Sequence, residues 1–338
     1  MPDLTKIHHL IRQEYGLDAI TVSPLQLHDV AGRGIYKVDI DEDKQYLLRA
    51  YQQPRETLTR LLNSAETLLF LEKVGYPAPR VRRTTEGALL GYCSGWSGLL
   101  LTYIPGAMST GTVAECRQIG EKLAELHNVQ IDGTAILYSA PLENQSVEVG
   151  IPHCRWQPKD RVTQWKGRLD EAAELVPDEL TELLEFSLDI LSQVMAWSEM
   201  PMALLHADPN PFNAICTPQN EMIFIDWDGS GLGPAILDLG YLLLTTHAVL
   251  PEWPRIEPNR VLIEAIMQGY SSVRPLNKME KQVLPIATCF NDAVWAAQNI
   301  PQVTGPGTQD WRENRTLNRF GARYPVLRTI GESALTSL

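Results

Sequence analysis

The sequence predicts an α+β fold in two parts: an antiparallel sheet with one main helix, followed by a larger, mostly helical region. Short alternating or apolar runs, separated by turn-forming residues, recur in residues 20–51 and 80–103 and are typical of strands. Pro105-Gly106 ends this pattern, and such a pair marks a boundary between structural parts. After it, apolar residues recur mainly at helical spacing, so we expect the rest of the chain to be helical.

The first part is expected to begin with a helix at residues 4–15, which has apolar residues on one face and Gly16 at its end. The stretch 55–74 has the apolar stripe of a longer helix. Strands are expected at residues 20–27, 34–40, 45–51, 80–83, 88–92 and 98–103. These strands form the predicted antiparallel sheet.

Periodicity in the second part predicts helices at residues 113–129, 165–175, 177–199, 258–270, 276–299 and 312–331. Prolines interrupt the pattern between residues 131 and 165, where we expect a loop or helical insertion beside a substrate cleft. His153 and Cys154 lie there, but two ligands without a second pair do not complete a zinc site.

Composition limits the possible partners. The 338 residues carry a net charge of −12 and show 44% hydrophobic residues, which suffices for a packed core. No cluster of Lys and Arg is present to neutralise nucleic-acid phosphates, so we expect no nucleic-acid partner. An acidic protein suits a cationic small-molecule substrate. We expect a monomer or a homodimer.

Cysteine usage and hydropathy predict a cytoplasmic protein that makes no use of a membrane. The five cysteines are scattered and form no C-x-x-C pair, which argues against a disulfide framework. The N-terminus lacks the apolar core of a signal peptide. Charged and polar residues, Asp238 and His247, interrupt the longest apolar run at residues 236–250, which falls short of a membrane span.

The most informative stretch is residues 206–228, reading HADPNPFNAICTPQNEMIFIDWD. It begins with the spacing H-x-D-x4-N and ends in Asp226-Trp-Asp228. Between them, two short apolar runs flank a turn sequence at 218–220, which predicts a β-hairpin. Because a hairpin brings its ends together, we expect the oxygen-bearing side chains of Asp208, Asn213 and Asp226 to converge.

This stretch resembles the catalytic core of the aminoglycoside phosphotransferase and choline kinase family, whose members phosphorylate small molecules. In protein kinases an Asp base is followed five residues later by a metal-binding Asn, and by a metal-binding Asp after a short hairpin. The resemblance implies a two-lobed protein-kinase-like fold with an N-lobe at 1–102, a hinge at 103–107 and a C-lobe at 108–338.

By this resemblance the chain transfers the γ-phosphoryl group of ATP or GTP to a hydroxyl of a small molecule. Asp208 is implied as the base that accepts the hydroxyl proton, and Asn213 and Asp226 as ligands of Mg²⁺. The role of Asp228 stays open. Asp238 is expected to be structural, and His127 to be a packing residue.

The nucleotide site is implied by further positions. Arg49 lies on the third strand, where kinases keep the basic residue that holds the α- and β-phosphates. The glycines Gly32 and Gly34 lie where a phosphate-covering turn is expected, and Tyr103 and Ile104 lie in the hinge. Kinases orient the basic residue with a helical Glu; the family pattern places it at Ser64, and the nearest acid is Glu66.

Two departures from the family leave alternatives open. The missing Glu is one, and the Pro209-Asn210-Pro211 sequence after Asp208 is the other, since two prolines stiffen the loop. A degenerate kinase fold that binds a ligand without turnover is one alternative, and a metal-dependent hydrolase is another. The acceptor is not determined by any motif: an antibiotic, choline, an amino alcohol, homoserine and a sugar all stay open.

Overall fold

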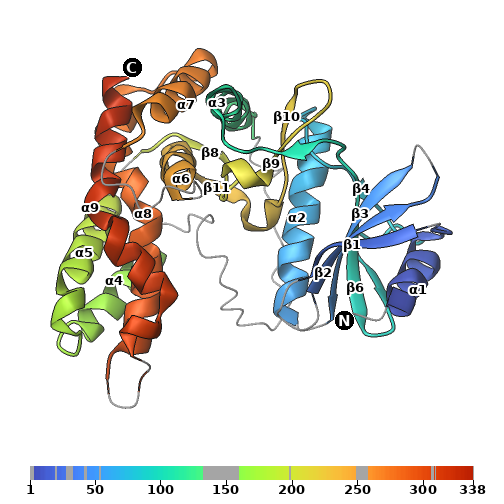
Figure 1. The fold of residues 1–338 in the computed structure, drawn as a ribbon, viewed down its shortest axis with the longest axis horizontal. Coiled ribbons are helices and arrows are strands. Elements are labelled where there is room, and N and C mark those ends of the chain that lie inside the picture. The colour runs from blue at the N-terminus through green and yellow to red at the C-terminus, as the bar shows by residue number, and fades with distance from the viewer. Residues whose placement is uncertain are drawn as a thin grey trace. The chain divides into compact units, whose positions relative to one another are not determined.

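The protein was analysed as a computed structural model (Figure 1) that describes residues 4–19, 21–27, 33–41, 44–52, 55–131, 160–197, 199–248, 258–305, 308 and 310–337. The chain forms two compact units. Unit 1 comprises Met1–Ala107, Ile131–Ile151 and Thr217–Ser230, and unit 2 comprises Met108–Gln130, Pro152–Cys216 and Gly231–Leu338. The stretch 206–228 is therefore divided between the two units after Cys216.

Unit 1 contains a six-stranded sheet in the order β1-β2-β3-β6-β4, with β5 also paired to β6. The strands are β1 (Thr21–Leu27), β2 (Arg33–Asp39), β3 (Gln45–Gln52), β4 (Val81–Arg82), β5 (Gly91–Cys93) and β6 (Trp96–Thr102). Every pair is antiparallel, as predicted. The strands β4 and β5 are shorter than the sequence pattern suggested.

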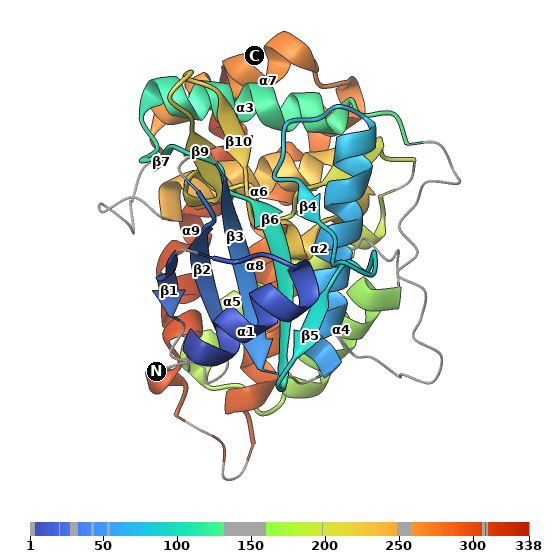
Figure 2. The same ribbon diagram turned by 90° about the vertical axis from the view of Figure 1, so that its right-hand side faces the viewer.

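Helix α1 (Leu4–Tyr15) packs on the sheet of unit 1 (Figure 2). Its residues form a core cluster with Leu48 and Ala50 of β3. The helix and sheet approach closely at Gly98, where a Cβ atom would lie 2.8 Å from a methyl carbon of Leu10. Since successive strand residues point to opposite faces, Arg49 points away from α1.

The remaining elements of unit 1 are α2 (Arg55–Lys73), β10 (Met222–Phe224) and the one-turn 3₁₀ helix η3 (Trp227–Gly229). Helix α2 packs against η3. The predicted turn before β10 is closed by the Thr217 N–H, which donates to the Glu221 carbonyl at 2.9 Å. Asn220 adopts φ 61° in this turn, a conformation that Asn tolerates better than most residues.

Unit 2 is mostly helical, as predicted. Its longer helices are α3 (Val113–His127), α4 (Asp160–Ala172), α5 (Thr181–Met195), α6 (Ala235–Ala248), α7 (Arg260–Val273), α8 (Lys278–Val303) and α9 (Arg315–Thr336). Shorter elements are η1 (Asp178–Leu180), β8 (Met202–Leu205), η2 (Pro211–Asn213), β9 (Ala214–Cys216), β11 (Gly231–Pro234) and η4 (Trp311–Glu313), and β7 (Ala107–Met108) lies at the unit boundary.

Local sequence explains several helix ends and crossings in unit 2. Thr112 and Glu115 form a capping box at the start of α3, and Asn277 and Glu280 form one at the start of α8, which satisfies backbone N–H groups that have no partner within the helix. Helices α3 and α7 pack together, and Gly120 lies at their contact, where an added Cβ would collide with the backbone of α7.

The helix predicted at 177–199 is divided into η1 and α5, and the one predicted from residue 165 begins already at Asp160. The insertion predicted between 131 and 165 lies largely outside the described residues, as do Gly32, His153 and Cys154. Across the part of the chain that the structure describes, no helix is long and apolar enough to cross a membrane.

Candidate active site

The loop that carries Asp208 begins at the end of β8 in unit 2. Strand β8 is apolar and its last three residues are buried. It pairs with β11 in antiparallel fashion, with Leu205 opposite Gly231. Helix α6 follows directly after β11, so the chain returns Asp238, in the first turn of α6, toward the start of the loop.

The Asp238 carboxylate anchors this loop through its backbone. It accepts hydrogen bonds from the N–H groups of His206 (2.6 Å) and Ala207 (3.0 Å). Ala207 has φ 80°, a left-handed conformation that costs a residue with a Cβ about 1–2 kcal/mol. The two bonds offset this strain, and the prediction that Asp238 is structural is confirmed.

His127 supports Asp238 from helix α3. Its Nε2 lies 3.3 Å from the Asp238 carboxylate, and its Nδ1 lies 2.7 Å from the Tyr270 hydroxyl. Burial lowers the pKa of His127, and this effect outweighs the opposite influence of Asp238. His127 is thus a buried, mainly neutral packing residue, as predicted. The Tyr270 hydroxyl also accepts a bond from Arg274 at 3.0 Å.

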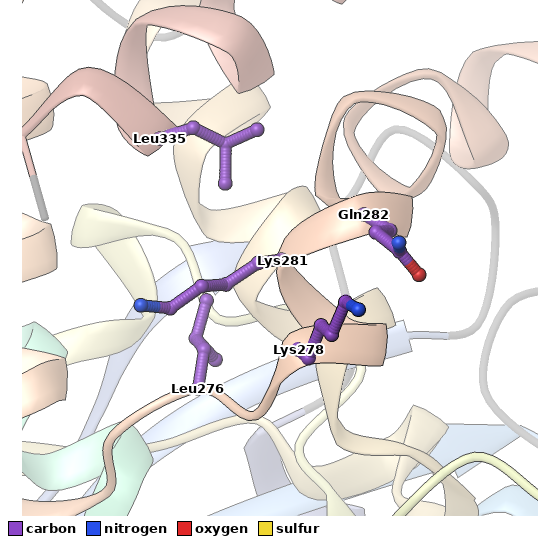
Figure 3. Close-up of a pocket in the computed structure, with 5 residues that line it drawn as sticks. All are labelled: Leu276, Lys278, Lys281, Gln282 and Leu335. Carbon is purple, nitrogen blue, oxygen red and sulfur yellow. The ribbon is translucent and has the colours of Figure 1, made fainter.

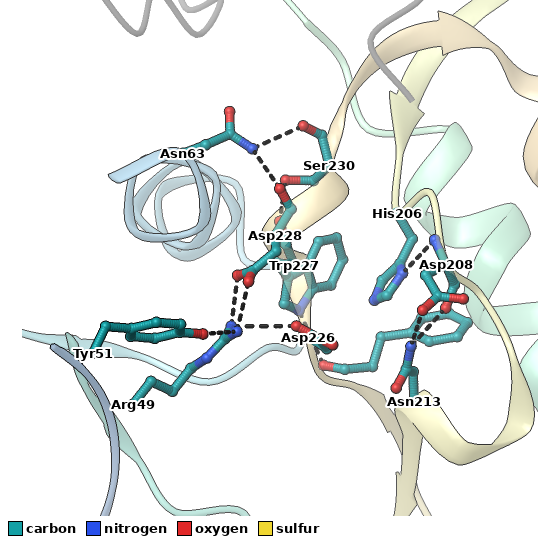
Figure 4. A network of polar contacts seen from close by, with 11 residues as sticks. Arg49, Tyr51, Asn63, His206, Asp208, Asn213, Asp226, Trp227, Asp228 and Ser230 are labelled. Atoms are coloured by element: carbon teal, nitrogen blue, oxygen red, sulfur yellow. Dashed lines mark hydrogen bonds and ion pairs between the residues drawn. The ribbon is translucent and has the colours of Figure 1, made fainter. Parts of the chain in front are cut away.

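Two amide side chains hold the Asp208 carboxylate, one at each oxygen, and Figure 4 shows the contact of Asn213. Asn210 Nδ2 donates to Oδ1 at 2.7 Å, and Asn213 Nδ2 donates to Oδ2 at 2.8 Å. Asn210 also caps η2 by accepting from the Asn213 N–H at 3.1 Å. The unusual Pro-Asn-Pro sequence therefore builds a short capped turn that orients the carboxylate, a role that the sequence did not reveal.

Asp226 lies in unit 1, after β10. Its backbone is left-handed, with φ 63° and ψ 65°, which is rare for a residue other than Gly, Asn or Asp and is concentrated at functional positions. The next residue, Trp227, is buried and packs edge-on against Tyr76 with ring centroids 6.1 Å apart. Its indole N–H donates to the Phe224 carbonyl at 3.1 Å. This packing fixes the segment that carries Asp226 and Asp228.

Arg49 on β3 forms a two-pronged ion pair with Asp228. Its two terminal nitrogens each donate to one carboxylate oxygen at 2.6 Å, and one also donates to the Tyr51 hydroxyl at 2.9 Å. Asp226 lies further away, with an N–O distance of 3.3 Å. Burial by itself lowers the pKa of Arg49, but the carboxylates of Asp228 and Asp226 raise it well above its ordinary value.

The two acids of the Asp226-Trp-Asp228 sequence differ in what they can bind. The Asp228 side chain is 23% exposed and both its oxygens are taken by Arg49, whereas the Asp226 side chain is 48% exposed. Oxygen ligands for a hard divalent cation need accessible lone pairs. Asp226 is the better suited of the two to bind such an ion.

Among the described side chains of α2, no acid pairs with Arg49. Arg49 bonds to Asp228 and Tyr51 and to neither Ser64 nor Glu66. The face of α2 that meets the segment 228–230 presents Asn63 and Thr67, and Glu66 is rotated from the middle of that face by close to a quarter turn. The sequence left open whether Ser64 or Glu66 supports the usual basic–acid pair, and the helix register places amide and hydroxyl groups on this face of α2.

The other nucleotide candidates lie in unit 1. The Tyr103 N–H donates to the Gln45 carbonyl at 3.1 Å and is therefore not available to a base, while within the described residues the Ile104 N–H has no backbone acceptor. Gly34 is a residue of β2, paired with Ala50. A Cβ atom there would lie 2.5 Å from the Tyr36 hydroxyl, so a larger residue does not fit.

A sequence profile described as the phosphotransferase enzyme family, which includes the aminoglycoside phosphotransferases, matches residues 29–276. The chain belongs to this family. This is the family that the resemblance of residues 206–228 implied.

Curated relatives of this chain include the homoserine kinase of Brucella ovis, which is 28% identical over 221 residues. The match covers 64% of this chain and 60% of that protein. The chain thus matches the relative over less than two thirds of the relative's length.

Solved structures similar to this chain support its fold. The amicoumacin kinase hAmiN aligns with a TM-score of 0.65 and 16% identity over 98% of this chain and 93% of that one. The Plasmodium vivax ethanolamine kinase aligns with a TM-score of 0.61 and 14% identity over 92% of this chain and 84% of that one. At such identities the likeness shows the kinase-like fold alone, which confirms the predicted fold class.

Unit 2 also contains a hollow of about 650 Å³ (Figure 3). It is lined by residues of the α7–α8 connection, α8 and α9: Leu276, Lys278, Lys281, Gln282 and Leu335. None of the predicted site residues lines it.

Proposed function

We propose that the chain transfers the γ-phosphoryl group of a nucleoside triphosphate to the hydroxyl of a small amine or amino acid, with homoserine and short amino alcohols as the first acceptors to test. The arrangement of Asp208 carries this proposal: its carboxylate is held at both oxygens by amide donors, on a loop whose backbone is anchored by Asp238. A base for hydroxyl deprotonation requires this kind of fixed orientation.

Asp208 would accept the proton of the acceptor hydroxyl and align its oxygen with the γ-phosphorus. Because phosphoryl transfer depends mainly on positioning and electrostatics, the loop geometry is the protein's main contribution on the acceptor side. The Asn210 amide keeps one carboxylate oxygen in place. The Asn213 amide holds the other oxygen.

Arg49 has the geometry to bind a nucleotide phosphate. Its Nε is buried and, among the described residues, has no hydrogen-bond partner, so a donor remains for a phosphate oxygen. The Ile104 N–H would bind the edge of the base. In support, the related amicoumacin kinase was crystallised with AMP-PNP and Ca²⁺, and a spectinomycin phosphotransferase with ADP.

Asn213 and Asp226 would hold a divalent cation, for which we propose Mg²⁺. They offer an amide and a carboxylate oxygen, the ligand types that Mg²⁺ prefers, and the exposed Asp226 side chain is consistent with this role. When bound, the ion neutralises charge on the transferred phosphoryl group.

The acceptor proposal rests on the relatives and on charge. The Brucella ovis relative is a homoserine kinase, and two of the similar structures are an aminopropanol kinase and an ethanolamine kinase. These acceptors combine a hydroxyl with an amine. The net charge of −12 on this chain suits a cationic group.

Coupled detection of ADP release tests the proposal. Purified enzyme with ATP and Mg²⁺ is offered homoserine, ethanolamine, aminopropanol, choline and an aminoglycoside, and we expect turnover with a hydroxylated amine. Asp208→Ala should abolish turnover while ADP binding measured by calorimetry persists. Asp170→Ala, which removes a surface ion pair with Lys166, serves as the matched control and should leave turnover unchanged.

Three results would each contradict part of the proposed function. Unchanged turnover in Asp208→Ala would overturn the role of Asp208. Phosphate release without nucleotide would favour the hydrolase alternative. ADP binding without turnover on any acceptor would favour a degenerate kinase fold.

A further inference from the structure

The Arg49–Asp228 pair joins two segments that are 179 residues apart in the sequence. The two terminal guanidinium nitrogens each donate to one of the two carboxylate oxygens at 2.6 Å, and the Arg49 side chain is only 9% exposed. A two-pronged contact of this kind fixes the plane of the guanidinium as well as its position. Arg49 therefore has one defined orientation in unit 1 before any nucleotide binds.

Among the described side chains of α2, no carboxylate bonds to Arg49. Ser64 stands where the family pattern places a Glu, and its hydroxyl is buried without a hydrogen-bond partner among the described residues. An Arg side chain has several freely rotating bonds, and holding it in one rotamer costs up to about 2 kcal/mol. Some other group must therefore orient Arg49, and Asp228 is placed to do so.

Asp228 is in turn held by α2 through its backbone (Figure 4). Asn63 Nδ2 donates to the carbonyl of Ser230 at 3.0 Å and lies 3.4 Å from the carbonyl of Asp228. The Thr67 hydroxyl lies 2.7 Å from the Ser230 hydroxyl, which donates to the Trp227 carbonyl at 2.7 Å. The helix thus acts on Arg49 indirectly, through the segment that carries Asp228.

We propose that Asp228 is the positioning residue of Arg49. It takes the place of the helical carboxylate that orients the phosphate-binding basic residue in kinases, and Asn63 and Thr67 link α2 to the segment that carries Asp228. The inference rests on the proposed function, in which Arg49 binds nucleotide phosphates. Arg has five N–H donors; two bond to Asp228, one bonds to Tyr51, and a terminal nitrogen also lies 3.3 Å from Asp226, so the Nε donor, which has no partner among the described residues, remains for a phosphate oxygen. In this arrangement Asp226 binds the metal and Asp228 does not.

Asp228→Glu tests the proposal because it keeps the charge and changes only the reach of the side chain. We measure the affinity for ADP by isothermal titration calorimetry, with Mg²⁺ and in EDTA. The expected result is about tenfold weaker ADP binding under both conditions, comparable to losing one charge-assisted hydrogen bond. Asp18→Glu, at an exposed ion pair with Arg12 in the same unit, is the matched control and should bind ADP like the wild type.

A double-mutant cycle separates this role from metal binding. In an Arg49→Met background, Asp228→Glu should have no further effect on ADP affinity, because the residue acts through Arg49. An Asp228→Glu effect that appears only with Mg²⁺ and adds to that of Arg49→Met would instead make Asp228 a metal ligand and overturn the proposal. Glu66→Gln should weaken ADP binding less than Asp228→Glu; the reverse order would also overturn it.

The controls distinguish this proposal from the proposed function. If the wild type binds no ADP, the proposed function fails. If the wild type binds ADP and Asp228→Glu binds it equally well, only the role of Asp228 fails. Should Asp228→Glu not fold, as judged by thermal unfolding, Arg49→Lys replaces it: this variant keeps the charge, loses the planar fork, and should show the same loss in both conditions.

Discussion

Asp238→Asn changes one oxygen of a buried carboxylate into an amide group, and it should loosen the loop that carries Asp208. The native carboxylate accepts from the His206 N–H at 2.6 Å and from the Ala207 N–H at 3.0 Å, and its side chain is almost fully buried. An Asn side chain has a single acceptor oxygen. One of the two backbone N–H groups therefore loses its acceptor.

The expected cost follows from these contacts. A hydrogen bond to a charged group contributes about 1.5–3 kcal/mol, and a buried donor without a partner costs about 1–3 kcal/mol. The left-handed conformation of Ala207 adds strain of about 1–2 kcal/mol. This strain is relieved when the loop leaves its native conformation, which reduces the loss in the free energy of unfolding. We expect Asp238→Asn to lower the free energy of unfolding by about 2–4 kcal/mol.

Two measurements check this expectation. Urea unfolding followed by tryptophan fluorescence gives the change in the free energy of unfolding. Hydrogen exchange followed by mass spectrometry gives the local effect, because the amides of His206 and Ala207 should exchange faster once Asp238 no longer holds them. Turnover should fall in parallel, since Asp208 is the next residue in the loop.

The matched control is Asp189→Asn in the same unit. Asp189 forms an exposed ion pair with Arg328 at 2.9 Å, and such pairs contribute about 0–1 kcal/mol. The reasoning would be refuted if Asp238→Asn were as stable as Asp189→Asn and its loop amides exchanged at the wild-type rate.

Three further predictions concern other parts of unit 2. Asn210→Ala removes a 2.7 Å bond to the Asp208 carboxylate and should lower kcat about tenfold with unchanged ADP affinity; a reduced ADP affinity at wild-type kcat would contradict it. Gly120→Ala collides with the α7 backbone and should lower the free energy of unfolding by at least about 1–3 kcal/mol, whereas Gly167→Ala, with open space around it, should raise it by about 0.4–1 kcal/mol; equal melting temperatures would refute the contrast. Burial lowers the pKa of His127. Its contribution to stability is therefore fully present above the unfolded-state pKa of about 6.5 and is lost as the pH falls toward the folded-state pKa. Between pH 7.5 and 5.5, the free energy of unfolding measured with urea should fall less in His127→Gln than in the wild type.

Much of the fold could be predicted because local sequence patterns encode it. The helix at residues 4–15 was predicted with the bounds that the structure has, since an apolar stripe and a terminal Gly are signals carried by neighbouring residues. Strand β2 alternates in burial with a period of two, as a strand with one buried face does. Helix ends were less certain: the stretch 177–199 looked continuous and is divided into η1 and α5.

The sequence by itself determined the family and the candidate residues Asp208, Asn213 and Asp226, because these lie within one stretch of 23 residues whose spacing is specific. It could not determine which acid meets Arg49. Periodicity identifies which residues of α2 share a face, but not which face meets the segment 226–230. Packing in three dimensions decided that Asn63 and Thr67 face this segment and that Asp228 pairs with Arg49. Contacts between residues far apart in the chain depend on how the elements are rotated against one another, and no local pattern encodes that rotation.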